Sequence, residues 1–389
     1  MACDSSFHGK ICEIPGIAVD NFKGENVNAR AFFLSHYHMD HVQGLKTGVL
    51  YNHLRRNNVF IYTSEITASI IEYENGSELR DFVKPLRRSG ELITLPSVPD
   101  KGLEELLVEV TLIPAGHSFG STMFLFKTAK ITVLYTGDFR IRINDIPKYS
   151  KLHNSNGEPI RIDAMYVDTT FIERQFEEFA KRSDTVDSVI NEIDTWLKAS
   201  DDHAISIFMY AKYTFEFLFN KIYQRLKMKV YVNNDKWALY RTLKDQVPGI
   251  TNNERETRIH LCMYKFGTND HGKCISLRDD KRYLHIHLTA AKWKNYTADD
   301  APINRLAETE TTTKIDACFS THCSRSELMS FVKYFNPMKI EGFPFKYVDD
   351  GTTSCSDKKF VLSPKSKMTY ARKKQYETAH VDGVMKKIF

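Results

Sequence analysis

The feature that most constrains this chain is the segment His36–His41, which reads His-Tyr-His-Met-Asp-His and follows an apolar run, Ala31–Leu34, after one serine. Four side chains that can bind a metal fall within six residues, where a buried strand is expected to end. Imidazole and carboxylate groups are good zinc ligands, and a loop lets neighbouring ligands converge as a strand cannot. The segment therefore predicts a metal site, with His36 and His38 on one ion and Asp40 and His41 on a second.

Two further strand ends carry metal-capable side chains. The segment 108–117 alternates in hydrophobicity and ends at His117, and the apolar run from 131 ends in Gly137 and Asp138. Loops at strand ends commonly gather a site. We expect His117 to join His36 and His38 on the first ion, with Asp138 bridging to the second. Two close divalent ions can activate a water for an in-line displacement, so no serine or cysteine nucleophile is required.

Composition narrows the class of protein without deciding its partner. The 389 residues are 42% hydrophobic and 26% charged, as in globular proteins, and the net charge of +5 permits a polyanionic partner without demanding one. Since 18 consecutive apolar residues are lacking, we expect no membrane span, and the N-terminus has no apolar run typical of a secretory signal. Seven scattered cysteines favour free thiols, with one metal pair at most.

The middle of the chain alternates between helical and strand patterns. Helices are predicted at 184–198, with Asp184 as N-cap, and at 215–226, and strands at 204–210 and 229–233. A further helix is predicted at 326–335 with Ser326 as cap. This alternation predicts a smaller α/β unit over 172–310. From 353 onward the chain is rich in lysine and arginine, which predicts a basic tail.

The whole set, HxHxDH, then His117 in a Gly-His pair and Asp138 in TGDF, resembles the metallo-β-lactamase superfamily. That resemblance implies an αββα sandwich with the metals at one end of its two sheets. Asp168 in YVDTTF and His322 in FSTHCSRS resemble the acidic residue and histidine of the β-CASP nucleases. These nucleases carry an inserted α/β β-CASP domain between the two motifs. The resemblance implies a catalytic domain at 1–170 and 313–352, an insert at 171–312 and a tail at 353–389.

Within that branch, ARAFFLSHYHMDHVQGL, PAGHSFGS and VLYTGDFR resemble the DNA-repair nuclease group. The resemblance implies that Asp40, Asp168 and His322 are catalytic, with His322 contacting the scissile phosphate or protonating the leaving oxygen. A family lysine that binds substrate phosphate matches Lys212, and Ser64 falls on a family motif near the site.

A structural zinc site is also implied within the insert. His260, Cys262 and Cys274 match a family pattern, but Tyr231 stands where a further histidine is expected. His271 could replace that ligand to complete a closed site of thiolates and imidazoles. The alternative is two buried thiols and two surface histidines.

We therefore expect a metal-dependent DNA nuclease of double-strand-break or crosslink repair, including non-homologous end joining. It would act as a 5′-to-3′ exonuclease, as an endonuclease opening hairpins and overhangs, or both. One or two Zn²⁺ ions are expected in the active site, with Mg²⁺ or Mn²⁺ as ions that also support activity. Expected partners are DNA ends, hairpins and single-strand overhangs, then a DNA-repair kinase or end-joining proteins, in the nucleus.

Three alternatives stay open. An RNA-processing β-CASP endonuclease is disfavoured because 346–353, KYVDDGTT, lacks the histidine common in that branch. A small-molecule hydrolase is disfavoured by the insert and by Asp168 and His322. A non-catalytic scaffold is disfavoured because the whole ligand set is present.

Overall fold

The structure is a computed structural model that describes residues 7–87, 89–208, 211–262, 281–309 and 312–349. The predicted zinc ligands His271 and Cys274 and the predicted tail 353–389 lie outside these residues. The described residues up to Tyr347 belong to one compact unit. No helix among the described residues is long and apolar enough to cross a membrane.

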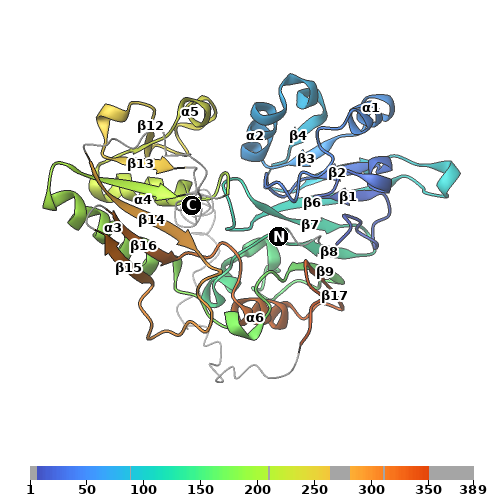
Figure 1. Cartoon of the computed structure of the whole chain (residues 1–389). Coiled ribbons are helices and arrows are strands. Elements are labelled where there is room, and N and C mark those ends of the chain that lie inside the picture. The colour runs from blue at the N-terminus through green and yellow to red at the C-terminus, as the bar shows by residue number, and fades with distance from the viewer. Residues whose placement is uncertain (1–6, 88, 209–210, 263–280, 310–311, 350–389) are drawn as a thin grey trace, which may run out of the picture. The chain divides into compact units, whose positions relative to one another are not determined.

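Two sheets build the part of the chain that carries the histidine segment (Figure 1). The first is parallel and has the order β1-β2-β3-β4, and the second is mixed and has the order β17-β9-β8-β7-β6-β5. The first comprises β1 (Ile17–Val19), β2 (Ala31–Phe33), β3 (Ile61–Thr63) and β4 (Val83–Pro85). The second comprises β5 (Glu91–Leu95), β6 (Leu106–Pro114), β7 (Thr122–Lys127), β8 (Thr132–Tyr135), β9 (Ala164–Asp168) and β17 (Lys339–Phe343).

Both faces of the strands β1, β2, β7 and β9 are buried, which explains their continuous apolar runs. Phe33 points between the sheets, where its ring lies 5.3 Å from Phe124 and 4.9 Å from Phe126. Phe32, the next residue of β2, points to the opposite face and packs with Leu50 of α1 (Gly48–Asn57) and Ile70 of α2 (Glu65–Asn75).

The outer face of the second sheet is covered in the same way. Met123 and Leu125 of β7 pack against Phe331 of α6 (Arg325–Phe335). The order of layers is helix, sheet, sheet, helix, and the predicted αββα sandwich is confirmed.

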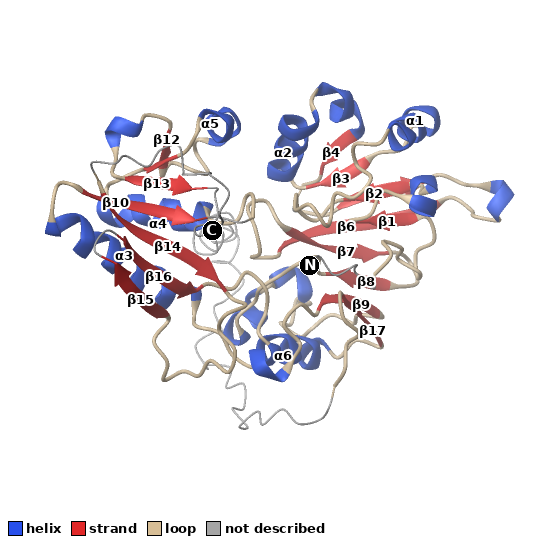
Figure 2. Cartoon of the chain, in the orientation of Figure 1, coloured by secondary structure: helices blue, strands red, loops and turns tan. Residues whose placement is uncertain are grey.

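A third sheet, of seven strands, lies between β9 and α6 in the sequence (Figure 2). Its order is β12-β11-β13-β10-β14-β16-β15, and every pairing is parallel except that of β15. It comprises β10 (His203–Phe208), β11 (Val230–Tyr231), β12 (Ile250–Thr251), β13 (Ile259–Cys262), β14 (Arg282–Thr289), β15 (Ile303–Thr309) and β16 (Thr312–Cys318). The accompanying helices are α3 (Arg182–Ala199), α4 (Glu216–Leu226) and α5 (Asn234–Tyr240).

The predicted inserted α/β unit is therefore present. Its domain boundaries remain a prediction. Since β16 pairs with β14 along its whole length, we propose that the insert ends after Cys318, instead of at 312.

The two predicted helix caps are wrong. α3 begins at Arg182 after Lys181, which makes no side-chain capping bond, and Asp184 lies in the first turn, where a carboxylate favours the helix dipole. The predicted cap Ser326 lies inside α6. The actual cap is Ser324, whose hydroxyl accepts from the Glu327 amide at 3.3 Å, while Glu327 accepts from the Ser324 amide at 2.9 Å.

We expect Ser324→Ala to lower the free energy of unfolding by about 1 kcal/mol, because it removes one half of this reciprocal cap. Urea unfolding followed by circular dichroism measures the change. Ser326→Ala is the comparison variant, because that serine makes no capping bond to the backbone of the first turn. Its hydroxyl lies 3.2 Å from that of Ser324, so we expect a smaller cost and not none. A larger cost for Ser326→Ala than for Ser324→Ala would contradict the assignment.

Candidate metal centre

The predicted site residues come together because they follow strands whose ends meet. His36 follows β2, His117 follows β6, Asp138 follows β8, and Asp168 is the last residue of β9. In parallel pairs such as β8 and β9 the carboxyl ends lie side by side, which brings their following loops into contact. His322 lies four residues after Cys318, the last residue of β16, and reaches the same place.

One group of four ligand atoms converges within 4.8 Å. The Nδ1 atom of His38 lies 3.1 Å from Nε2 of His36 and 3.0 Å from Nε2 of His117. The Oδ2 atom of Asp138 lies 3.7 Å from the His36 nitrogen and 3.5 Å from the His117 nitrogen. These four are the side chains predicted for the first ion.

A second group shares Asp138. The Nε2 atom of His41 lies 3.4 Å from Asp138 Oδ2 and 3.6 Å from Asp40 Oδ2. These are the side chains predicted for the second ion, and their ligand atoms also lie within 4.8 Å of one another. Asp138 is thus placed where one carboxylate could bridge two cations.

In each of the four histidine rings, the nitrogen that points away from the cluster, here called the outer nitrogen, faces an oxygen atom. His36 Nδ1 contacts Ser35 Oγ at 2.9 Å, and this hydroxyl itself donates to Asp20, so it accepts from the ring. The other three contacts are His117 Nδ1 to Thr321 O at 3.1 Å, His38 Nε2 to Lys212 O at 2.8 Å and His41 Nδ1 to Asp20 Oδ2 at 2.9 Å. Each ring can therefore donate outward and present its lone pair inward, as metal-binding histidines do.

The charge states of His36, His38 and His117 agree with this arrangement. Burial lowers the pKa of His36 and His117 well below the usual value and that of His38 to about 4. These rings are therefore neutral near pH 7, as ligands must be. For His41, burial is outweighed by the carboxylates of Asp138 and Asp20, which raise its pKa. That ring lies against the most negative part of the site, where a cation would be held.

Asp20 is a site residue that the sequence reasoning missed. Its carboxylate accepts from the Ser35 amide at 2.7 Å, the Ser35 hydroxyl at 2.6 Å, His41 at 2.9 Å and the Tyr135 hydroxyl at 2.8 Å. It is 6% exposed. Asp20 follows β1 directly in IAVD, so the strand-end pattern that pointed to Asp138 and Asp168 could have found it.

Asp168 and His322 form a pair beside the cluster. Asp168 Oδ2 lies 2.7 Å from His322 Nδ1, while its other oxygen accepts from the amide and hydroxyl of Thr170. Burial alone would lower the pKa of His322, but the carboxylates of Asp168 and Asp138 outweigh it and raise that pKa to about 9. Since Nδ1 is bound to Asp168, Nε2 of His322 remains as a second donor, and one ligand atom of His322 lies within 4.8 Å of a carboxylate oxygen of Asp138.

A buried guanidinium pair fixes the loops that carry His117 and His322. Arg182 donates to Gly116 O at 2.8 Å and to Ser320 O at 3.3 Å, and Arg140 donates to the same Ser320 oxygen at 3.0 Å. Arg140 also forms two hydrogen bonds with the Glu327 carboxylate, at 3.1 and 3.3 Å. α3 and α6 are thereby tied to both histidine loops.

The two predicted substrate contacts are placed near the site but are engaged elsewhere. Lys212 Nζ makes an ion pair with Glu74 at 2.7 Å. Ser64 caps α2 by accepting from the Thr67 amide, and its hydroxyl donates to Gly120 O at 2.7 Å, in the loop after His117. Both side-chain polar groups are thus bound to residues outside the metal cluster, and their substrate role stays a prediction.

Of the predicted structural zinc site, the structure describes His260 and Cys262, both buried on β13. Tyr231 of β11 lies directly beside His260 in the register. Within the described part of the chain, no group of three ligands at metal spacing includes either residue. The site stays a prediction.

Comparison with known proteins decides the family. The sequence family described as "DNA repair metallo-beta-lactamase" matches residues 244–342. Protein artemis of Mus musculus is 32% identical over 351 residues, which is 86% of this chain and 48% of that protein. This chain belongs to the DNA repair metallo-beta-lactamase family. The inserted α/β unit and the buried His/Asp cluster described above agree with membership of this family.

Two more distant matches complete the comparison. The 5' exonuclease Apollo of Gallus gallus is 36% identical over 160 residues, 40% of this chain and 30% of that protein. A solved structure of a protein of unknown function from Enterococcus faecalis V583 aligns with a TM-score of 0.48 at 14% identity, over 81% of this chain and 75% of that one. This chain spans about half the length of the Artemis relatives that it matches.

Proposed function

We propose that this chain is a metal-dependent nuclease that hydrolyses phosphodiester bonds of DNA in double-strand-break or crosslink repair. The observation that carries the proposal is the inward convergence of four imidazole nitrogens on Asp138, beside the Asp168–His322 pair. Membership of a DNA-repair family supports DNA as the substrate.

The residues fit a pair of divalent cations. His36, His38, His117 and Asp138 would hold the first, and Asp40, His41 and Asp138 the second. Such ions supply an activated water and stabilise charge on the reacting phosphate oxygens. We propose Zn²⁺ on the grounds of imidazole and carboxylate ligands, with Mg²⁺ or Mn²⁺ as ions that also support activity.

The chain's own contribution is to bind and orient the phosphate and to handle a proton. His322 is held by Asp168 through Nδ1, so its Nε2–H can donate to a phosphate oxygen or to the departing oxygen. Asp168 is nearly fully buried and fixes the tautomer, and Thr170 satisfies its second oxygen. His322 therefore acts as a proton donor, and Asp168 as the group that orients it.

The finer parts of the function are also proposals. We propose 5′-to-3′ exonuclease action, hairpin- and overhang-opening endonuclease action, or both, in the nucleus and alongside DNA-repair kinase or end-joining partners. An RNA-processing nuclease would use the same metal chemistry on RNA, so the experiment has to distinguish RNA cleavage from DNA cleavage. The scaffold reading is disfavoured by the complete ligand cluster.

The test is cleavage of end-labelled strands by the purified full chain. The substrates are a DNA hairpin, a 5′-phosphorylated single DNA strand and an RNA strand of matched sequence. Each is assayed with wild type, with chelator-treated protein and with the metal restored. Cleavage of DNA that disappears with chelator and returns with metal is expected, and product lengths separate endonuclease from exonuclease action. RNA cleavage without DNA cleavage, or none on any strand, would overturn the proposal.

A further inference from the structure

The turn formed by Lys212, Tyr213 and Thr214 contacts both histidine loops of the metal centre. The Lys212 carbonyl accepts from His38 Nε2 at 2.8 Å, and the Thr214 hydroxyl lies 3.3 Å from the same nitrogen. The Tyr213 carbonyl accepts from the amide of Phe119 at 2.7 Å, two residues after His117. This turn, which follows β10 of the insert, therefore supplies the outer partner of a metal-facing ring.

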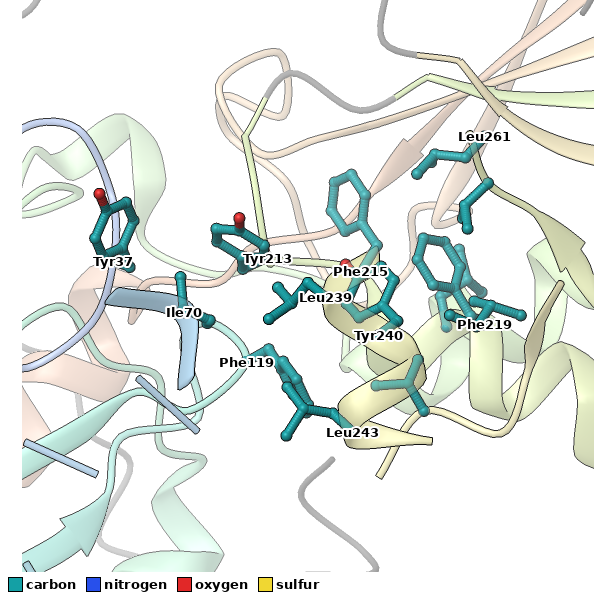
Figure 3. Packing of buried hydrophobic residues seen from close by; sticks show 14 of the residues in the cluster. Tyr37, Ile70, Phe119, Tyr213, Phe215, Phe219, Leu239, Tyr240, Leu243 and Leu261 are labelled. Carbon is teal, nitrogen blue, oxygen red and sulfur yellow. The ribbon is translucent and has the colours of Figure 1, made fainter. Parts of the chain in front are cut away.

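Tyr213 holds an unusual backbone conformation. Its φ angle is +60°, in the left-handed region that bulky residues rarely adopt. Such a conformation persists where the surroundings fix it. Figure 3 shows Tyr213 between Tyr37 and Ile70 on one side and Leu239 and Tyr240 on the other, and it is 4% exposed. Packing holds its ring, but the direction of the neighbouring Lys212 carbonyl depends on the polar contacts around it.

The last turn of α2, Tyr73–Asn75, provides those contacts. Glu74 Oε1 accepts from Lys212 Nζ at 2.7 Å and from the Tyr213 hydroxyl at 2.5 Å. Asn75 Oδ1 accepts at 3.2 Å from Tyr37, the residue between His36 and His38. The Tyr73 hydroxyl donates to the Asp235 carbonyl of α5.

We propose that Glu74 is a positioning residue for the metal centre, which fixes the Lys212–Thr214 turn so that the Lys212 carbonyl orients the ring of His38. The inference deepens the proposed function and rests on its metal site, but not on the identity of the substrate. It also gives the Lys212 ammonium a partner other than phosphate. Burial would raise the pKa of Glu74, but its bonds to Lys212 and Tyr213 lower it below the usual value, so the carboxylate is ionised near pH 7.

His38 is the ring with most need of such an anchor. His36, His41 and His117 are buried, whereas His38 is only partly buried. The other three outer nitrogens face groups of the two-sheet part or of the His322 loop, while the partner of His38 comes from the turn after β10 of the insert. Loss of an outer partner of a metal-binding histidine lowers metal affinity by about 10- to 100-fold.

The experiment measures metal binding apart from DNA cleavage. Co²⁺ is titrated into chelator-treated full chain, and the visible absorption of bound Co²⁺ gives the apparent Kd and reports the ligand geometry. The variants are Glu74→Ala, Glu74→Gln and Tyr213→Phe. Glu72→Ala is the matched control, because Glu72 is a glutamate of the same helix that pairs with exposed Arg80.

We expect Glu74→Ala to raise the apparent Kd for Co²⁺ by about 10- to 100-fold and to change the absorption band. Glu74→Gln is expected to recover part of this loss, since its amide oxygen still accepts from Tyr213. Tyr213→Phe is expected to raise the Kd by about three- to tenfold, because one hydrogen bond is lost and the ring remains. Glu72→Ala is expected to bind Co²⁺ like wild type, and excess metal should restore most of the cleavage rate of the Glu74 variants.

Wild-type Co²⁺ binding by Glu74→Ala would overturn the inference, whether cleavage is kept or lost. Lost cleavage with unchanged Co²⁺ binding would indicate instead that Lys212 binds substrate phosphate. Should thermal unfolding without metal show that Glu74→Ala does not fold, Tyr213→Phe decides by the same measurement. If the wild-type chain binds Co²⁺ but cuts no nucleic acid, the proposed function fails, while the Co²⁺ titrations still decide the role of Glu74.

Discussion

Asp40→Ala is expected to abolish DNA cleavage while the fold persists. The Asp40 carboxylate lies 3.6 Å from the inner nitrogen of His41 and would hold the second ion with it. A metal that stabilises the reacting oxygens contributes several kcal/mol, so the rate should fall by at least about 10³-fold. The side chain is 63% exposed, so its removal leaves no buried group without a partner. Initial cleavage rates at saturating metal and the thermal unfolding midpoint without metal test both halves of this expectation.

Asp187→Ala is the matched control, because that aspartate is 61% exposed, lies on α3 and pairs with Arg225 away from the cluster. It should cleave like wild type. Near-normal cleavage by Asp40→Ala would refute the two-ion arrangement. Equal losses in both variants would mean that the effect arises from surface charge instead of metal binding.

His322→Ala is expected to lower the cleavage rate by about 10²- to 10⁴-fold, the usual range for a positioned proton donor. Co²⁺ binding should remain close to wild type, because the first group of ligands does not include His322. Asp168→Asn should give a loss of similar size, since it removes the acceptor that holds His322 Nδ1. Residues that act as one unit give losses that do not add, so the double variant should be no slower than the slower single variant.

Single-turnover cleavage rates at saturating metal test whether Asp168 and His322 act as one unit. They are measured for the two single variants and for the double variant. Additive losses would show that Asp168 and His322 act separately. A fall in Co²⁺ affinity in His322→Ala equal to the fall in rate would instead make His322 a ligand.

The site was predictable wherever its chemistry resides in side chains at strand ends. His36, His38, Asp40 and His41 could be predicted from local spacing alone. Side chains within six residues of a loop can converge on one site whatever the rest of the chain does. His117 and Asp138 required only the expectation that strand ends meet. Asp168 and His322 lie 154 positions apart in the sequence, and they were paired only through a family resemblance.

The parts that were not predictable depend on backbone atoms or on residues with ordinary structural roles. The acceptor for His38 is the carbonyl of Lys212, and a carbonyl has no signature in the identity of its residue. Glu74 reads in the sequence as one more acid of an amphipathic helix. The cap of α6, in contrast, was predictable, although it was placed two residues too late. Ser324 has Glu327 three residues on, which fits the capping-box pattern, whereas Ser326 has Met329 at that place.

The position of β17 bears on shortened forms of this protein. β17 pairs in parallel with β9 from Lys339 to Phe343, and the Phe343 carbonyl accepts from the Thr169 amide, next to Asp168. A premature stop before Lys339 would keep every residue of the metal centre, yet leave β9 as an exposed edge strand. Unpaired edges recruit strands of other chains. Such a product should aggregate although its reactive groups are complete, so its loss of activity would be a failure of solubility.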